Sequence, residues 1–331
     1  MKKTLKAAVA ASVLATPAMA ANMENPLYLP AQGQLYSKTS AGIMYKKADG
    51  TDANNKKNHA GAIEFPIYRG QEDIGYGITD RLSVNGSFGY THDGDIDRQG
   101  MHLGRLGLTY RAFDSYDDFI WDWYVDAHLG GVSKMTGKFD LSSALGGTGT
   151  GFSYDNYSNG RWGFYAGTRL GKTWGKFTGA VFAEVLQTFG NDNNEITVLS
   201  ANSLFQGTLS INLKSTTEFN AGLKAFYEID ERWSLGGGFT YKHHADNGIK
   251  SISSISGGAG LPTLAPTLAA TMANMNDGFD EYILSASVAN RLTDSVQIAL
   301  YGEYTFDTAH VNSQNGTDVK AEAGVRLNVA F

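Results

Sequence analysis

The sequence predicts an all-β protein, a single transmembrane antiparallel up-and-down β-barrel of about 12 strands with short periplasmic turns and long extracellular loops. Three observations carry this prediction. Apolar and polar side chains alternate along most of the chain, short and long connections alternate between those segments, and the chain begins with an export signal. The 331 residues include 40 Gly, 17 Phe and 17 Tyr, with a net charge of −6 and a mean hydropathy of −0.25.

The composition excludes several classes of chemistry. The chain has no cysteine, so disulfides, thiol catalysis and Cys-based zinc sites are excluded. Lys and Arg are scattered and form no basic stripe, so nucleic acid is not an expected partner. No cofactor and no metal ion are expected.

The first 20 residues predict a secretory signal peptide. Lys2, Lys3 and Lys6 precede an apolar stretch at 7–14, and Ala18-Met19-Ala20 is an A-x-A cleavage site, with cleavage after Ala20. A membrane-spanning helix needs about 20 apolar residues, which this stretch does not reach. We expect a signal peptide at 1–20, a periplasmic segment at 21–34 and the barrel at 35–331.

The C-terminus shows the alternation most clearly. Apolar side chains occupy the odd positions from Val319 to Phe331, so one face of this strand is apolar and the other polar. A soluble sandwich and a membrane barrel both produce this pattern. The ending resembles the C-terminal signal of Gram-negative outer-membrane β-barrels, carried here by Val325, Leu327, Val329 and Phe331. That resemblance implies a place in the cell outer membrane, contact with its lipid, and recognition by the barrel-assembly machinery.

Repeated turns divide the chain into strands. The segments 77–84, 228–235 and 291–298 each place an Asp in a short polar turn, which is typical of a hairpin. The predicted strands are 35–47, 61–77, 81–92, 101–113, 119–132, 160–172, 176–189, 217–229, 232–244, 279–291, 295–307 and 317–331. Segment 195–213 is interpreted as an extracellular hairpin extension, which leaves 14 strands as the alternative count. The alternation loses phase near Gly70, where we expect a bulge.

A second resemblance concerns the segment 76–84. Its Tyr-Gly-Ile-Thr-Asp-Arg-Leu-Ser-Val sequence is similar to the turn and strand of transporter-like barrels associated with aromatic-compound degradation clusters. The resemblance implies passive uptake across the outer membrane, with apolar or aromatic solutes as candidates.

Polar positions opposite the apolar face predict the lumen. In the strand at 119–132, Trp121 and Trp123 would face lipid. The predicted lumen-lining residues on the solute path are Arg105, Arg111, Asp122, Asp126, His128, Arg161, Arg169, Glu184, Lys224, Lys242, Glu303 and Arg326. Tyr124, Tyr165, Glu281, Tyr301 and Glu322 are also expected to point inward, as are Glu64 and Asp73. Such a lumen is either a narrow polar channel that selects solutes by charge or a filled barrel stabilised by ion pairs.

Candidate chemistry is sparse. Asp126 and His128 share one face, a pairing similar to the Asp/His arrangement of the omptin outer-membrane proteases, but the ten-strand barrel and Trp-rich motifs of that family are absent. The acidic run Asp93, Asp95 and Asp97 lacks the Gly of a calcium loop, because Arg98 takes its place. His243, His244 and Asp246 fit an exposed polar rim or a metal site. We expect no catalytic residue and no enzymatic activity.

These observations predict an outer-membrane channel or facilitator for passive transport of small solutes. Four lumen arginines favour anionic solutes, and the second resemblance favours aromatic ones. The alternative is a non-conducting surface barrel whose extracellular loops bind a partner in an adhesive or structural role. The segment 249–275 is unusually apolar for an external loop and is interpreted as a plug, a cover for a solute route, or a binding surface. The oligomeric state is left open.

Overall fold

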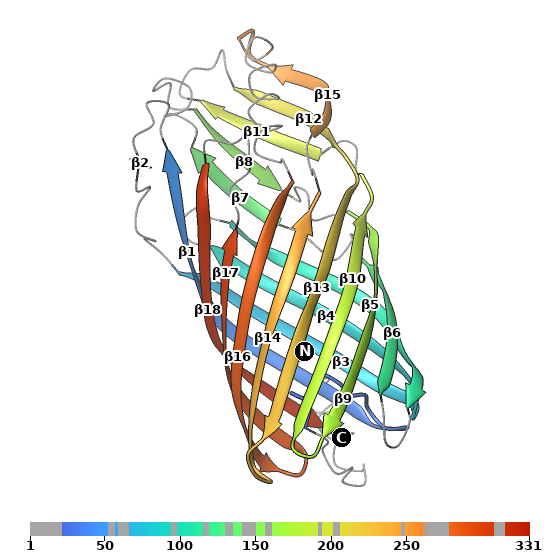
Figure 1. The fold of residues 1–331 in the computed structure, drawn as a ribbon. Helices are drawn as coiled ribbons and strands as arrows, with labels where there is room; N and C mark the ends of the chain where they lie inside the picture. Colours follow the sequence, from blue (N-terminus) through green and yellow to red (C-terminus); the bar gives the residue numbers. More distant parts are fainter. Residues whose placement is uncertain are drawn as a thin grey trace, which may run out of the picture.

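The computed structural model shows a closed antiparallel β-barrel that carries a layer of shorter strands at one end (Figure 1). The structure describes residues 22–51, 57–58, 66–93, 98–114, 119–129, 135–140, 150–155, 161–190, 194–200, 206–245, 249–260, 262, 278–307 and 315–331. The predicted signal peptide at 1–20, most of the apolar loop at 249–275, and Glu64 lie outside these residues.

Twelve strands close the barrel, as the alternation predicts. In their order around it they are β1 (Leu35–Thr51), β3 (Ile67–Thr79), β4 (Leu82–Asp93), β5 (Arg98–Asp114), β6 (Ile120–His128), β9 (Gly163–Trp174), β10 (Phe177–Thr188), β13 (Thr216–Glu228), β14 (Trp233–His244), β16 (Phe279–Thr293), β17 (Val296–Asp307) and β18 (Asn315–Ala330). Every neighbouring pair is antiparallel. The predicted strand count of 12 is therefore confirmed.

The last strand closes the barrel against the first. β1 and β18 pair in unbroken register from Tyr36 opposite Ala330 to Ala48 opposite Asp318. Beyond the last pair, the Phe331 amide donates to the Leu35 carbonyl at 2.8 Å, and the Leu35 amide donates to the Phe331 carbonyl at 3.2 Å. The terminal residue thus completes the ladder at the seam.

Six shorter strands lie at the end of the barrel that carries the long connections (Figure 1). They are β2 (Lys57–Asn58), β7 (Met135–Asp140), β8 (Thr150–Asp155), β11 (Asn194–Ser200), β12 (Gly207–Leu213) and β15 (Ile249–Gly257). β7, β8, β11, β12 and β15 pair in that order. The β11–β12 pair is the hairpin expected within 195–213, and it does not add strands to the barrel.

Side chains on the barrel strands divide into an outer apolar and an inner polar set. On β6, Trp121, Trp123 and Val125 are 40–51% exposed on the outside, whereas Asp122 is 0% exposed. Large apolar side chains at Leu108, Val181, Leu223 and Leu300 are likewise exposed on the outer wall. This inverted pattern is the one expected where lipid surrounds the barrel.

β3 contains no bulge at Gly70, contrary to the prediction. Gly70 pairs in register with Ala41 on one side and Tyr90 on the other, and the register shifts only between Gly77 and Thr79. The sequence loses its phase because Glu72 occupies an outer position, where it accepts hydrogen bonds from the Ser37 and Thr39 hydroxyls. Asp73 points inward, as predicted, and accepts from Gln71 at 2.9 Å.

The tight turns use two different side chains. In the turn after β13, the Asp230 carboxylate accepts from the amides of Arg232 and Trp233, both at 2.8 Å, as an Asx turn does. In the turn after β3, the Thr79 hydroxyl accepts a hydrogen bond from the Arg81 amide at 3.2 Å. In the turn after β16, the Thr293 hydroxyl accepts one from the Ser295 amide at 3.2 Å. Asp80 instead accepts from the Gln32 amide at 3.1 Å. No helix among the described residues is long and apolar enough to cross a membrane.

Candidate functional site

The segment 22–34 folds back into the end of the barrel that carries the tight turns. Two local turns shape it: the Asn25 amide donates to the Asn22 carbonyl at 2.9 Å, and the Tyr28 amide donates to the Asn25 carbonyl at 3.0 Å. Met23 and Leu27 are 2% and 5% exposed. These apolar side chains anchor the segment among polar lumen walls.

Hydrogen bonds join this segment to strands on different sides of the barrel. The Asn22 amide group donates to the Ser234 hydroxyl of β14 at 3.0 Å, and the Asn25 amide group donates to the Thr178 hydroxyl of β10 at 3.2 Å. From β1, the Lys38 ammonium donates to the Met23 carbonyl at 2.8 Å. The segment therefore crosses the lumen.

Glu24 is the charged anchor of the segment. Its carboxylate accepts from Arg326 at 3.0 and 3.1 Å and from Asn328 at 2.9 Å. Burial raises the pKa of Glu24. The nearby charges of Arg326 and Lys38, together with the hydrogen bonds from Asn328 and Arg326, lower it by more than burial raises it, so the pKa lies below its ordinary value. Glu24 is therefore ionised at neutral pH, and its bonds to Arg326 are charge-assisted.

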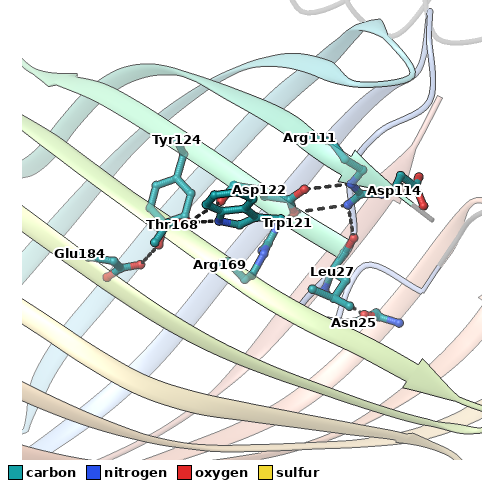
Figure 2. A network of polar contacts seen from close by, with 10 residues as sticks. All are labelled: Asn25, Leu27, Arg111, Asp114, Trp121, Asp122, Tyr124, Thr168, Arg169 and Glu184. Atoms are coloured by element: carbon teal, nitrogen blue, oxygen red, sulfur yellow. Dashed lines mark hydrogen bonds and ion pairs between the residues drawn. The ribbon is translucent and has the colours of Figure 1, made fainter. Parts of the chain in front are cut away.

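Asp122 is the centre of a second network in the lumen (Figure 2). One carboxylate oxygen accepts from Arg111 Nε at 2.9 Å, and the other accepts from Arg169 at 2.6 Å. Arg111 also donates to the Leu27 carbonyl at 2.6 Å. The network thus connects β5, β6 and β9 to the segment 22–34, and one carboxylate compensates two guanidinium groups.

The other predicted arginines are also engaged. Arg105 lies over the Tyr165 ring, with its guanidinium carbon 4.8 Å from the ring centroid, which is a cation–π geometry. Arg161, two residues before β9, donates to the Lys214 carbonyl at 2.9 Å. The four arginines predicted as an anion-selective series therefore each have partners within the protein.

The remaining predicted lumen residues are on the inner face. Glu184 accepts from the Tyr124 hydroxyl at 2.6 Å, and Lys242 pairs with Glu218 at 3.4 Å. Asp126 accepts from Asn85 at 3.4 Å; among the described contacts, none joins it to His128. Lys224 and Glu303 line the same cavity. Whether these residues contact a passing solute stays a prediction.

Two adjoining polar cavities lie in the lumen, and the segment 22–34 borders the larger of them. One has a volume of about 260 Å³ and is bounded by Met23, Glu24, Lys38, Lys224, Glu303 and Arg326 among others. The other, of about 190 Å³, reaches Asp126 and Glu184. Arg169 and Lys224 line both cavities. The lumen is thus narrowed by the segment, while space for small molecules remains.

The paired histidines do not act together. His243 bonds to Asp280 at 2.7 Å, whereas His244 lies between Glu281 at 3.0 Å and Glu218 at 3.1 Å. Consecutive residues of a strand point to opposite faces, so the two rings are on different sides of the wall. Within the part of the chain that the structure describes, no cluster of His, Asp and Glu could hold a metal ion. Asp246 lies outside that part.

Sequence reasoning missed the role of the segment 22–34. The sequence feature that could have indicated a folded segment is its pair of asparagines. The Asn22 side chain accepts a hydrogen bond from the Glu24 amide at 3.2 Å, and the Asn25 side chain accepts one from the Leu27 amide at 2.9 Å. Asn is typical of such turns, and the pair predicts a folded segment rather than a free linker. Nothing in the segment itself indicates that it enters a barrel.

No family model and no curated protein matches the sequence. Among solved structures, the chain is similar to an outer membrane channel from Pseudomonas putida F1, with a TM-score of 0.55 and 14% identity over 95% of this chain and 100% of that chain. It also resembles the translocator domain of autotransporter NalP from Neisseria meningitidis (TM-score 0.49, 9% identity, 91% of this chain and 90% of that one). A third similar structure is the Pseudomonas putida toluene transporter TodX (TM-score 0.47, 10% identity, 92% and 90%). The likeness to the first structure confirms that this chain has the fold of an outer-membrane β-barrel.

Proposed function

We propose that this protein is a channel in the cell outer membrane through which small charged solutes diffuse passively. The observation that carries the proposal is the lumen. It is lined by polar and charged side chains, is crossed by the segment 22–34, and retains two cavities. The apolar outer wall supports a place in lipid.

The pairing of the arginines argues against a strong preference for anions set by those residues. Arg111 and Arg169 share Asp122, and Arg105 packs on Tyr165. A lumen lined by both positive and negative side chains favours solutes whose own charges match that arrangement. The segment 22–34 crosses the lumen and so limits the size of solute that can pass. Bulky solutes are expected to be excluded.

Conductance in a planar lipid bilayer tests the proposal. The mature chain 21–331 and a variant that lacks residues 22–33 are refolded, and closed barrels are verified by circular dichroism and by their mobility on unheated gels. We expect discrete conductance steps from both, with larger steps from the variant because the segment no longer narrows the lumen. Absence of steps from both folded proteins would contradict a channel.

Reversal potentials measured on the same protein test charge selectivity. Arg105→Ser and Arg169→Ser are expected to change the ratio of anion to cation permeability by less than twofold, since Asp122 engages the Arg169 guanidinium and the Arg105 guanidinium packs on the Tyr165 ring. The exposed turn residue Arg232, replaced by Ser, is the matched control. A large loss of anion preference would instead restore the arginines as the selectivity determinant.

A further inference from the structure

A hollow lined by small residues interrupts the inner wall between β13 and β17. Gly238 of β14 and Ser285 of β16 lie in one row between Lys224 and Glu303. In the neighbouring row Gly236 and Ser287 lie between Phe226 and Tyr301. Four small residues are thus flanked on both sides by long side chains.

The hollow faces the lumen. A Cβ atom added at Gly238 would lie 3.0 Å from the Ser285 hydroxyl and 3.5 Å from Cγ of Lys224, so these three residues share the inner face. The cavity of about 260 Å³ is lined by Gly236, Ser285 and Ser287 of this part of the wall, and Met23 and Glu24 of the segment 22–34 border it. The absence of side chains on β14 is therefore what leaves this space open.

The two charges at the ends of the hollow are distinguished by the absence of a direct hydrogen bond or ion pair among the described residues. Lys224 contacts the Phe182 ring, with its ammonium 5.1 Å from the centroid, and within the described residues it makes neither a hydrogen bond nor an ion pair. Glu303 likewise has none among those residues. By contrast, Arg326 is paired with Glu24, and Arg169 with Asp122.

The spacing prevents the two charges from neutralising each other directly. They are three strands apart, and neighbouring strands are about 4.8 Å apart, so their Cα atoms are separated by roughly 14 Å. No ion pair joins them. A cation and an anion, neither of them in a direct hydrogen bond or ion pair among the described residues, therefore face one cavity across a floor of glycine and serine.

We propose that this hollow binds a small zwitterion, whose carboxylate pairs with Lys224 and whose ammonium pairs with Glu303. Each pair is a charge-assisted hydrogen bond, and the Ser285 and Ser287 hydroxyls are within the same cavity. A simple anion would meet Glu303 and Glu24, and a simple cation would meet Lys38, Arg169, Lys224 and Arg326, whereas a zwitterion places one charge at each end of the hollow. The inference rests on the proposed function, because the solute reaches the hollow through the lumen.

Calorimetric titration of the detergent-solubilised chain 21–331 tests the inference without measuring transport. Glycine, 4-aminobutyrate and 6-aminohexanoate vary the distance between the two charges, and butyrate and butylamine each carry only one of them. We expect at least one amino acid to bind, with tenfold or greater preference over both singly charged probes. Equal binding of butyrate, or binding of none of the five, would overturn the inference.

Variants locate the site. Lys224→Gln and Glu303→Gln are each expected to weaken binding of the amino acid tenfold or more, and Gly236→Val is expected to abolish it, because Gly236 lines the cavity. Lys176→Gln and Glu231→Gln remove the same charges from exposed turns and serve as controls with unchanged binding. If Lys224→Gln and Glu303→Gln bind like the controls while remaining folded, the hollow is not the site. A protein that conducts but binds no amino acid contradicts this inference alone.

Discussion

Asp122 is the residue on which the charge balance of the lumen depends most. It is 0% exposed and lies between Arg111, which is also buried, and Arg169, which remains partly accessible. A buried charge is tolerated only when it is paired and hydrogen-bonded. Here one carboxylate satisfies two cations, and one of them also holds the Leu27 carbonyl.

Replacing Asp122 by Asn is expected to destabilise the barrel by about 3–5 kcal/mol, because two guanidinium groups lose their compensating charge. Urea unfolding in lipid vesicles, followed by tryptophan fluorescence, measures the loss. The control is Asp114→Asn, which removes an exposed carboxylate 3.9 Å from Arg111. This change should lower the free energy of unfolding by less than about 1 kcal/mol. Similar losses in the two variants would show that Asp122 has no special role.

Glu72 is the residue that breaks the alternation. It lies on the outer wall, in the row that includes the exposed side chains of Tyr68, Ile74 and Tyr76. A carboxylate facing lipid is costly, and the Ser37 and Thr39 hydroxyls offset that cost by donating to it.

Removing the two hydroxyl donors is expected to lower the free energy of unfolding more than removing the donors and the Glu72 carboxylate together. Ser37→Ala combined with Thr39→Val leaves the Glu72 carboxylate without donors and should cost about 1–3 kcal/mol in unfolding free energy. Adding Glu72→Leu to this double variant should restore stability. If the triple variant is less stable than the double one, Glu72 contributes more than these hydroxyls explain.

At the scale of elements, the segment 22–34 and β3 fit closely at one glycine. The Gly33 amide donates to the Gly77 carbonyl at 2.8 Å, and the Gly77 amide donates to the Gln34 carbonyl at 2.9 Å. A Cβ atom at Gly77 would overlap the Ala31 carbonyl group. Backbone packs on backbone here, and only glycine leaves room for it.

Gly77→Ala is therefore expected to loosen the segment while leaving the barrel closed. Limited proteolysis should cut within 22–34 at least tenfold faster in the variant, and its conductance steps should become larger. Gly70→Ala on the same strand is the matched control, since its nearest non-neighbouring atom would be 3.9 Å away. Equal cleavage of the two variants would contradict a tight fit at Gly77.

The molecule as a whole depends on the seam between β1 and β18. β1 also pairs with β3, and β18 with β17, but the pairing of β1 with β18 joins the first and the last strand of the barrel. Closure removes both sheet edges, which would otherwise expose unpaired backbone groups to lipid. The reciprocal bonds between Leu35 and Phe331 complete it.

Deleting Phe331 tests its two expected roles separately. Loss of two backbone hydrogen bonds should lower the unfolding free energy by about 1–3 kcal/mol. The yield of folded barrel in cells should fall further than this stability loss explains, if the assembly machinery recognises the terminal Phe. Phe331→Tyr, which keeps the aromatic ring and the backbone, is the control. An unchanged cellular yield of the deletion variant would contradict the recognition role.

The sequence by itself determined the barrel. Alternation with period 2 distinguishes the lipid face from the lumen, and this holds for β6, where Trp121 and Asp122 point to opposite sides as predicted. The turn residues located the hairpins. The predicted strand boundaries agree with those of the structure within a few residues, except at the starts of β3, β5 and β9 and the ends of β1 and β6. These features are local, because the backbone geometry of a strand and a turn is set within a few residues.

Only the tertiary structure decided which charges compensate one another. Arg111, Asp122 and Arg169 come from three strands, and the Leu27 carbonyl comes from a segment that precedes all of them. Likewise, Lys224 and Glu303 face the same hollow because the register across β13, β14, β16 and β17 places them in one row. Such contacts depend on strand order and register over long sequence separations, and these are fixed only when the barrel closes.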